Sequence, residues 1–187
     1  MPTQPRILVS PLNWGLGHAS RCVPVIRELL KQGADVIVGA EEGPAALLKT
    51  EFPQLEFLEF PGYDITYPSG GNMAVHMLKI MPKILAGIKK ENALLTQKIK
   101  ELDLTGVISD NRFGLHTELV PTVFMTHQIM IKAPYGESFI RKLNGRFMNK
   151  FSRVWIPDFA DDPNLSGDLA HLHEAQENSS FIGPLRR

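Results

Sequence analysis

The chain has 187 residues, 43% of them hydrophobic, which suits one α/β domain with a substantial core better than two compact domains. Twenty Lys and Arg residues balance twenty Asp and Glu residues, so no overall field directs the protein to nucleic acid or an anionic membrane. The single cysteine, Cys22, excludes an internal disulfide framework, and no apolar run approaches the ~20 residues that span a bilayer. We therefore expect a cytoplasmic protein, at most peripherally attached to the inner face of the cell membrane.

Short apolar runs alternate with helical patterns along the first part of the chain. Strands are predicted at 6–10, 35–39 and 55–60, and helices at about 19–32 and at 44–50. A loop rich in Gly, Pro and Tyr follows over 61–72. This loop is longer than most connections in compact domains, which favours a functional or mobile segment.

The same alternation continues to the end of the chain. A long helix is predicted from Met73 to Leu102, with a kink or restart at Pro82. Strands are predicted at 106–109, 122–125, 153–156 and 181–182, and a helix at 137–151. This order predicts a doubly wound, Rossmann-like parallel sheet occupying residues 1–187 as a single domain.

A glycine-rich turn between the first strand and the first helix carries the strongest functional signal. Residues 13–21 read Asn-Trp-Gly-Leu-Gly-His-Ala-Ser-Arg. Gly15 and Gly17 allow a tight bend and a close approach to a ligand, and the helix N-terminus favours an anion such as a diphosphate. His18 then stands at the ligand-binding edge of the sheet, where an imidazole accepts a proton near neutral pH. The competing interpretation is a histidine that only caps a turn.

Polar side chains also follow the fourth and fifth predicted strands. Asp110, Asn111 and Arg112 come directly after one strand, and His127 follows the next, between Thr126 and Gln128. Asp110 either orients His18, binds an acceptor hydroxyl or caps the next helix, and Arg112 is a candidate to hold an anionic group. His127 either lines a substrate cleft or satisfies a buried loop.

The charges near the end of the chain are segregated. Six basic residues and one acidic residue lie between 129 and 153, and six acidic residues without Lys or Arg lie between 157 and 178. The basic helix either packs against the sheet through Ile140, Leu143, Phe147 and Phe151 or also contacts anionic lipid headgroups. The Met-rich start of the long helix near Met77 reads as core, with contact to an apolar acceptor as the alternative. No metal-ligand spacing occurs, and Asp161-Asp162 reads as part of a solvated linker.

Five stretches together resemble the MurG-like family of GT-B glycosyltransferases, and more closely a bacterial subgroup of it. The first is the Gly-x-Gly-His-x-x-Arg turn, and the others stand in the same order at later strand ends: 109–114, 126–128, 155–158 and 181–185. The resemblance covers nearly the whole chain. It implies the acceptor-side N-terminal domain of a hexosyltransferase, with a UDP-sugar as donor and a sugar or lipid-linked acceptor.

The resemblance also implies roles for individual residues. His18 is the implied catalytic base, no metal or other cofactor is required, and the substrate-binding residues are Gly15, Gly17, Ser20, Arg21, Asp110, Asn111, Arg112 and His127. Enzymes of this kind have a second Rossmann-like domain that supplies most of the nucleotide-sugar site. We therefore expect this chain to be a piece of a longer enzyme or one half of a two-chain enzyme, and to be inactive alone.

Two other functions fit parts of the sequence. Residues 15–20 nearly form the Gly-x-Gly-x-x-Gly fingerprint of a dinucleotide-binding Rossmann domain, with Glu41 or Glu42 near the position of a ribose-binding acid. Ser20 replaces the third glycine, however, and residues 11–14 lengthen the turn. The other alternative is a non-catalytic subunit that binds the acceptor or the membrane for a two-chain transferase.

Overall fold

Seven strands form one sheet, and four α-helices cover it, in the part of the chain that the computed structural model describes, residues 4–62, 73–127, 137–171 and 177–186. The strands are β1 (Arg6–Pro11), β2 (Asp35–Gly39), β3 (Glu56–Leu58), β4 (Gly106–Asp110), β5 (Thr122–Met125), β6 (Arg153–Ile156) and β7 (Ser179–Phe181). The helices are α1 (Leu16–Lys31), α2 (Glu42–Glu51), α3 (Met73–Glu101) and α4 (Glu137–Met148), with a short 3₁₀ turn, η1, at Gly167–Leu169.

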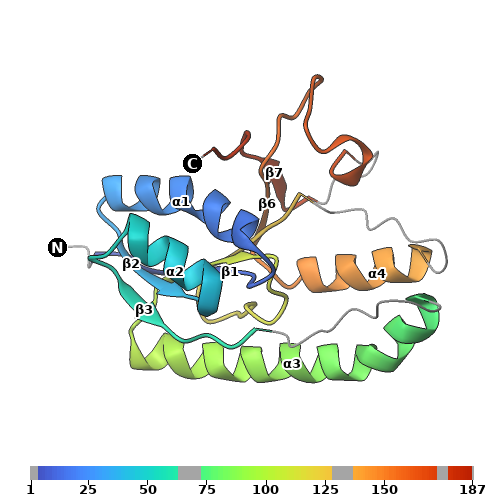
Figure 1. Ribbon diagram of the computed structural model, residues 1–187, viewed down its shortest axis with the longest axis horizontal. Coiled ribbons are helices and arrows are strands. Elements are labelled where there is room, and N and C mark those ends of the chain that lie inside the picture. The colour runs from blue at the N-terminus through green and yellow to red at the C-terminus, as the bar shows by residue number, and fades with distance from the viewer. Residues whose placement is uncertain (1–3, 63–72, 128–136, 172–176, 187) are drawn as a thin grey trace.

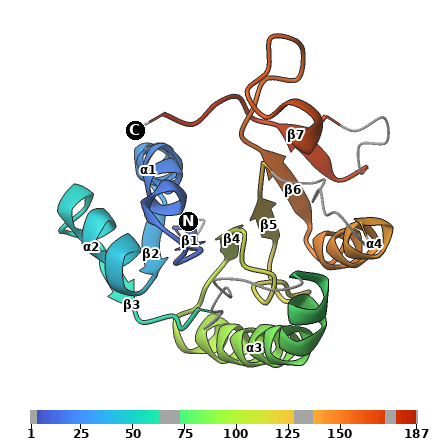
Figure 2. The same cartoon turned by 45° about the vertical axis from the view of Figure 1, so that its right-hand side comes forward.

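The strand order is β3-β2-β1-β4-β5-β6-β7, and every adjacent pair is parallel. Parallel neighbours require crossover connections, which place helices on both faces of the sheet. Figure 1 shows the resulting arrangement, and Figure 2 shows α1 and α2 on one side of the sheet with α3 and α4 on the other. The predicted doubly wound, Rossmann-like α/β fold is confirmed.

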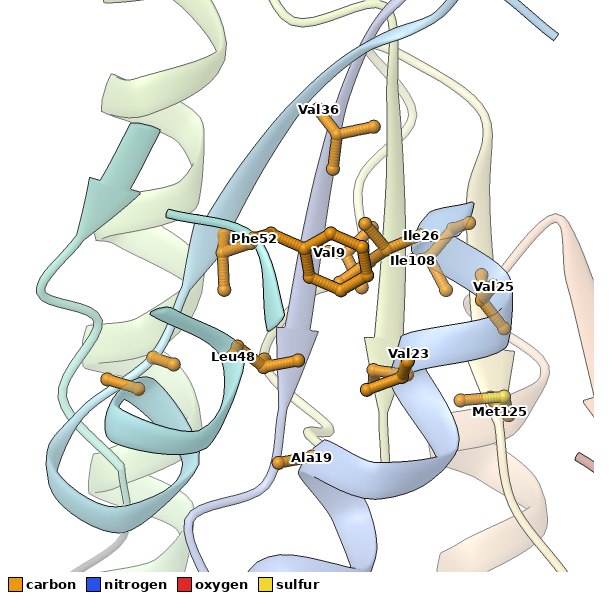
Figure 3. Packing of buried hydrophobic residues seen from close by; sticks show 14 of the residues in the cluster. Val9, Ala19, Val23, Val25, Ile26, Val36, Leu48, Phe52, Ile108 and Met125 are labelled. Atoms are coloured by element: carbon orange, nitrogen blue, oxygen red, sulfur yellow. The ribbon is translucent and has the colours of Figure 1, made fainter. Parts of the chain in front are cut away.

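A separate hydrophobic cluster fills the space on each side of the sheet. On the α1 side, Val9, Val36 and Ile108 of the sheet pack with Val23 and Ile26 of α1 (Figure 3). The C-terminal segment returns to this side, where Ile182 and Leu185 pack against the same cluster. On the other side, the cluster includes Phe60, Leu95, Phe124, Met148 and Phe151. Successive residues of a strand point to opposite faces, so β1 to β6 each contribute to both clusters, whereas β7 contributes Phe181 to the second one.

Most sequence-predicted elements agree with the structure, and the differences lie at their ends. The strands predicted at 35–39, 122–125 and 153–156 have the predicted bounds. The first helix begins at Leu16 rather than near residue 19, which places Gly17 and His18 in its first turn instead of the preceding loop. The helix predicted to end at 151 ends at Met148. Within α3, the helix continues through Pro82 and does not restart there.

Candidate active site

The carboxyl ends of β1 and β4 meet at the centre of one edge of the sheet. β1 continues into α1 on one face, whereas β4 is reached from α3 on the opposite face. A doubly wound sheet binds its ligands at such a point, because the connections diverge there and leave a crevice. The side chains that follow these two strands, and those that follow β5 and β6, therefore define the candidate active site.

Gly15 turns the chain from β1 into α1. Its φ of 82° lies in the left-handed region, which glycine adopts without steric cost, and the helix begins at the next residue. His18 and Arg21 are three residues apart in α1, a spacing that places both side chains on the same face of the helix. Both lie mainly under protein, with 15% and 13% of their side-chain surface exposed.

Asp110 points toward α1 because of its position in β4. Ile108 packs in the cluster on the α1 side, and residues two apart in a strand share a face. The Asp110 side chain is fully buried, and its carboxylate accepts hydrogen bonds from Nε of Arg21 at 2.9 and 3.0 Å. Nη2 of Arg21 lies 2.7 Å from Oδ1 of Asp110, and Nδ1 of His18 lies 3.1 Å from Oδ2. The structure thus brings the candidate base together with Asp110, for which orienting His18 was one of three alternatives.

Arg21 also contacts both histidines of the site. Nη2 of Arg21 lies 2.6 Å from Nδ1 of His18, and Nη1 lies 2.6 Å from Nδ1 of His127, which follows β5. Burial, reinforced by the positive charge of Arg21, lowers the pKa of His127. His127 is therefore a neutral imidazole at neutral pH.

A pocket of about 270 Å³ adjoins these groups. Its lining comes from Arg21, from His127, from residues 157–158 and 165–166 after β6, and from Pro184 and Leu185 of the C-terminal segment. Polar groups from α1 and β5 thus meet apolar side chains in one concavity. A small ligand in this pocket would contact both.

Asp158 fixes the wall of the pocket that follows β6. Its buried carboxylate accepts bonds from the backbone N–H groups of Phe159, Leu165 and Ser166 at 2.8–2.9 Å, and from the Ser166 hydroxyl. Burial alone would raise the pKa of Asp158, but these hydrogen bonds outweigh it and hold the pKa far below the ordinary range of an aspartic acid. Asp158 therefore remains ionised and organises the 158–166 segment.

Arg112 does not lie in the crevice, contrary to the sequence-based expectation. Its side chain is fully buried on the α3 side, where Nε is 2.5 Å from Oε1 of Glu91 and Nη2 donates to the carbonyls of Phe60 and Pro61. Asn111 causes the difference, because its φ of 63° turns the chain between Asp110 and Arg112. A guanidinium that is buried and committed to a carboxylate is a structural group and is not available to a substrate anion.

The remaining predicted residues fall at or near the crevice. Gly15 and Gly17 are exposed at the start of α1, and a Cβ atom built on either would meet no atom within 4 Å. Ser20 and Asn111 are partly buried, and the N–H of Asn111 donates to the carbonyl of Met125. No helix follows β4 directly, so Asp110 is not a helix cap. Gln128 and most of the predicted 61–72 loop lie outside the described residues.

Sequence reasoning missed two buried acids, Asp158 and Glu91, although each had a signal. Asp158 lies at the carboxyl end of β6, separated only by Pro157 from its last residue, much as Asp110 lies at the carboxyl end of β4. Glu91 occurs three residues after Ile88 and four before Leu95, on the buried stripe of α3. An acid on such a stripe requires a partner, which is Arg112 here. Glu41, the acid of the dinucleotide-binding alternative, accepts the N–H of Gly62 at 2.9 Å and a longer bond from Asn13.

The described part of the chain contains neither a metal-binding cluster nor a membrane-spanning helix. No group of three or more His, Cys, Asp or Glu side chains there is arranged to hold a metal ion. Among the same residues, no helix combines the length and apolar character needed to cross a membrane.

The described part of the chain has the Rossmann-like α/β fold that also occurs in solved glycosyltransferases of the GT-B type. MurG of Acinetobacter baumannii superposes with a TM-score of 0.57 at 13% identity, covering 98% of this chain and 46% of that one. A UDP-glucosyltransferase from Polygonum tinctorium gives 0.62 at 11% identity over 100% of this chain and 53% of that one. The glycosyltransferase of kitacinnamycin gives 0.61 at 15%, covering 98% and 52%.

These similarities establish the fold that the motifs predict. The chain spans about half the length of each of these solved structures. No protein-family model matches the sequence, and no curated protein does.

Proposed function

We propose that this chain is the acceptor-side half of a nucleotide-sugar glycosyltransferase that transfers a hexose or hexosamine to a cell-envelope or lipid-linked acceptor. The observation that carries the proposal is the pairing of His18 with buried Asp110 at the switch point of a GT-B-type sheet. A buried carboxylate that contacts one ring nitrogen of a histidine orients the imidazole, so that its other nitrogen can act as a base. The description of the Polygonum tinctorium protein as a UDP-glucosyltransferase supports a UDP-sugar as the donor.

The proposed reaction inverts the anomeric carbon. With its proton on Nδ1 and donated to Asp110, His18 accepts the hydroxyl proton of the acceptor at Nε2. The acceptor oxygen then forms a bond to the anomeric carbon while the bond from that carbon to the diphosphate oxygen breaks. The nucleoside diphosphate leaves with the electron pair, and Asp110 stabilises the imidazolium that forms.

The start of α1 is the proposed site for the charge of the leaving group. Gly15 and Gly17 leave this end of the helix open, and the first turn of an α-helix presents unpaired N–H groups and a positive dipole end. Ser20 follows in the next turn. We propose that the free N–H groups of this helix end and the Ser20 hydroxyl, and not a metal ion, stabilise the diphosphate, and that a second domain supplies most of the nucleotide contacts. The guanidinium of Arg21 is already committed to Asp110, His18 and His127.

The basic face of α4 supports peripheral contact with the cytoplasmic face of a membrane. Lys142, Arg146 and Lys150 are exposed on and just after this helix, whereas Phe147 and Phe151 pack inward. Clustered basic side chains are attracted to anionic lipid headgroups. The protein should sediment with vesicles containing phosphatidylglycerol and not with neutral phosphatidylcholine vesicles, and Lys142→Glu with Arg146→Glu should abolish sedimentation. Equal sedimentation with both kinds of vesicle would contradict this contact.

The function is tested by a donor screen on the longest natural form of the protein. Nucleoside diphosphate release is measured with UDP-glucose, UDP-N-acetylglucosamine and UDP-galactose, with and without lipid-linked and soluble acceptors, and with EDTA in a parallel series. One donor should be consumed only when acceptor is present, at a rate that EDTA leaves unchanged. His18→Ala should lower this rate by at least about 100-fold, because general base catalysis contributes about that much or more.

His116→Ala is the matched control. His116 lies beside Phe151 on the far side of the sheet, so its removal should leave the rate near that of the wild type. Wild-type rates in His18→Ala would remove His18 from the mechanism. A melting shift with NAD(H) and none with any UDP-sugar would favour the dinucleotide-binding alternative.

A further inference from the structure

The guanidinium of Arg21 contacts three side chains of the candidate active site, and the proposed reaction gives these contacts no role. Its guanidinium lies within hydrogen-bond distance of Asp110, of His18 and of His127 at once. An arginine side chain has only donors and does not lose its proton in proteins. Every nitrogen or oxygen that it contacts must therefore act as an acceptor.

This requirement fixes the proton of His127. Nη1 of Arg21 is 2.6 Å from Nδ1 of His127, so Nδ1 must carry a lone pair. A neutral imidazole has one N–H group, which then has to be on Nε2. Because His127 lines the pocket, the nitrogen left for a ligand is a donor.

At His18, a hydrogen-bond donor and a hydrogen-bond acceptor both face the same ring nitrogen, Nδ1. Nδ1 of His18 is 2.6 Å from Nη2 of Arg21, which requires an acceptor, and 3.1 Å from Oδ2 of Asp110, which requires a donor. Only one of these bonds can form at a time. When Nδ1 carries the proton and donates it to Asp110, Nε2 has a free lone pair and can accept a proton. When Nδ1 instead accepts a hydrogen bond from Arg21, the proton of the neutral ring is on Nε2, which then cannot accept another.

We propose that Arg21 is a positioning residue that sets the protons of both histidines: it holds His127 as an Nε2–H donor toward the pocket, and it competes with Asp110 for Nδ1 of His18. The two histidines then have different roles, with His127 donating to an oxygen of the bound ligand and His18 acting as the base. The proton positions follow from the contacts of this chain and do not depend on glycosyl transfer. Only the catalytic roles assigned to the two histidines rest on the proposed function.

The test is the tautomeric state of each histidine, read from the imidazole nitrogen and carbon-bound proton resonances of the ¹⁵N-labelled chain. Single His→Gln variants assign the signals. In the wild-type protein, His127 should be in the Nε2–H form, and His18 should show exchange between its two tautomers. A wild-type His127 protonated on Nδ1 would overturn the proposal without any variant of Arg21.

Arg21→Met should change the two histidines in opposite ways. His18 should shift to the Nδ1–H form, because Asp110 alone then faces Nδ1, whereas His127 should lose its preference for Nε2–H. His127 should also titrate at higher pH, because Arg21 contributes to lowering its pKa, while Asp110, Asp158 and His18 remain as its other charged or titratable neighbours.

Arg27→Met is the control, since Arg27 lies on the same helix but pairs with Glu51 at the surface. Its spectra should keep both wild-type tautomers. Unchanged tautomers of His18 and His127 in a folded Arg21→Met protein would refute the role of Arg21. The proposed function can fail in the donor screen while these tautomers are still observed, so the two ideas are separable.

Discussion

Side-chain direction at the end of β4 separates a candidate catalytic residue from a structural one. Asp110 shares the face of Ile108 and meets His18 and Arg21, whereas Arg112, two residues later, is buried against Glu91 on the opposite face. The positive φ of Asn111 interrupts the strand alternation between them. Two charged residues that are two positions apart in the sequence thus have different roles: Asp110 belongs to the candidate site, and Arg112 belongs to the packing of α3.

Asp110→Asn tests the orienting role of the carboxylate. The amide cannot stabilise an imidazolium, and its NH₂ group favours the wrong tautomer of His18. We expect kcat to fall on the order of 10²–10⁴-fold with little change in KM for the donor. Asp35→Asn, which affects an exposed pair with Arg6 at the other end of the sheet, should keep the wild-type rate. Equal rates for both variants would show that Asp110 does not act in catalysis.

Asp158 makes the free energy of unfolding depend on pH in the acidic range. Its pKa in the folded protein lies below the ~3.9 of an unfolded aspartic acid, so the stabilisation is complete above that value and is lost as the pH falls through the folded pKa. Asp158→Asn should cost about 2 kcal/mol at pH 7, because a hydrogen-bonded charge is lost. In urea unfolding, this deficit should stay constant from pH 7 to about pH 5 and should shrink as the pH falls further toward 2. A deficit that does not change with pH would contradict the argument.

At the scale of elements, the contact between α3 and the segment after β4 depends on a glycine. Gly114 lies against α3, and its N–H donates to Glu91 at 2.8 Å while Glu91 also binds Arg112. A Cβ atom at Gly114 would lie 2.6 Å from the backbone oxygen of Ile88. Because Arg112 also donates to the carbonyls of Phe60 and Pro61, this contact links α3 to the segments that follow both β3 and β4.

Gly114→Ala should destabilise the protein by about 1–3 kcal/mol, because α3 must move to admit the methyl group. Gly17→Ala is the control within a helix, since a Cβ atom there meets nothing, and alanine should instead stabilise α1 by about 0.5–1 kcal/mol. Urea unfolding midpoints and slopes measure both effects. A Gly114→Ala protein as stable as the wild type would show that α3 yields to the methyl group.

At the scale of the whole molecule, hydrophobic clusters pack on both faces of the sheet, whereas the candidate site lies at the carboxyl edge of the strands. The solved structures with this fold are about twice as long as this chain. In the proposed function, a second domain faces that edge and brings the nucleotide-sugar to His18. Folding and catalysis then depend on different parts of the enzyme.

We therefore expect the 187-residue chain to fold alone and to transfer no sugar alone. Calorimetry should show one cooperative unfolding transition, because both clusters share the same sheet. Under the conditions of the donor screen, the isolated chain should release no nucleoside diphosphate. Transfer at the rate of the longest natural form would disprove the need for a second domain.

The sequence by itself determined the order of strands and helices, the parallel doubly wound sheet, and the edge where His18, Asp110 and His127 would meet. Hydrophobic periodicity and glycine positions are local signals, and parallel strands necessarily end at a common edge. Only the tertiary structure decided which strand-end side chains share a face, that Arg112 pairs with Glu91, and that Arg21 joins the two histidines. The contacts of Arg112 with Glu91 and of Arg21 with His127 connect residues 21 and 106 positions apart, and the direction of Arg112 also depends on a turn at Asn111 that no local pattern predicted.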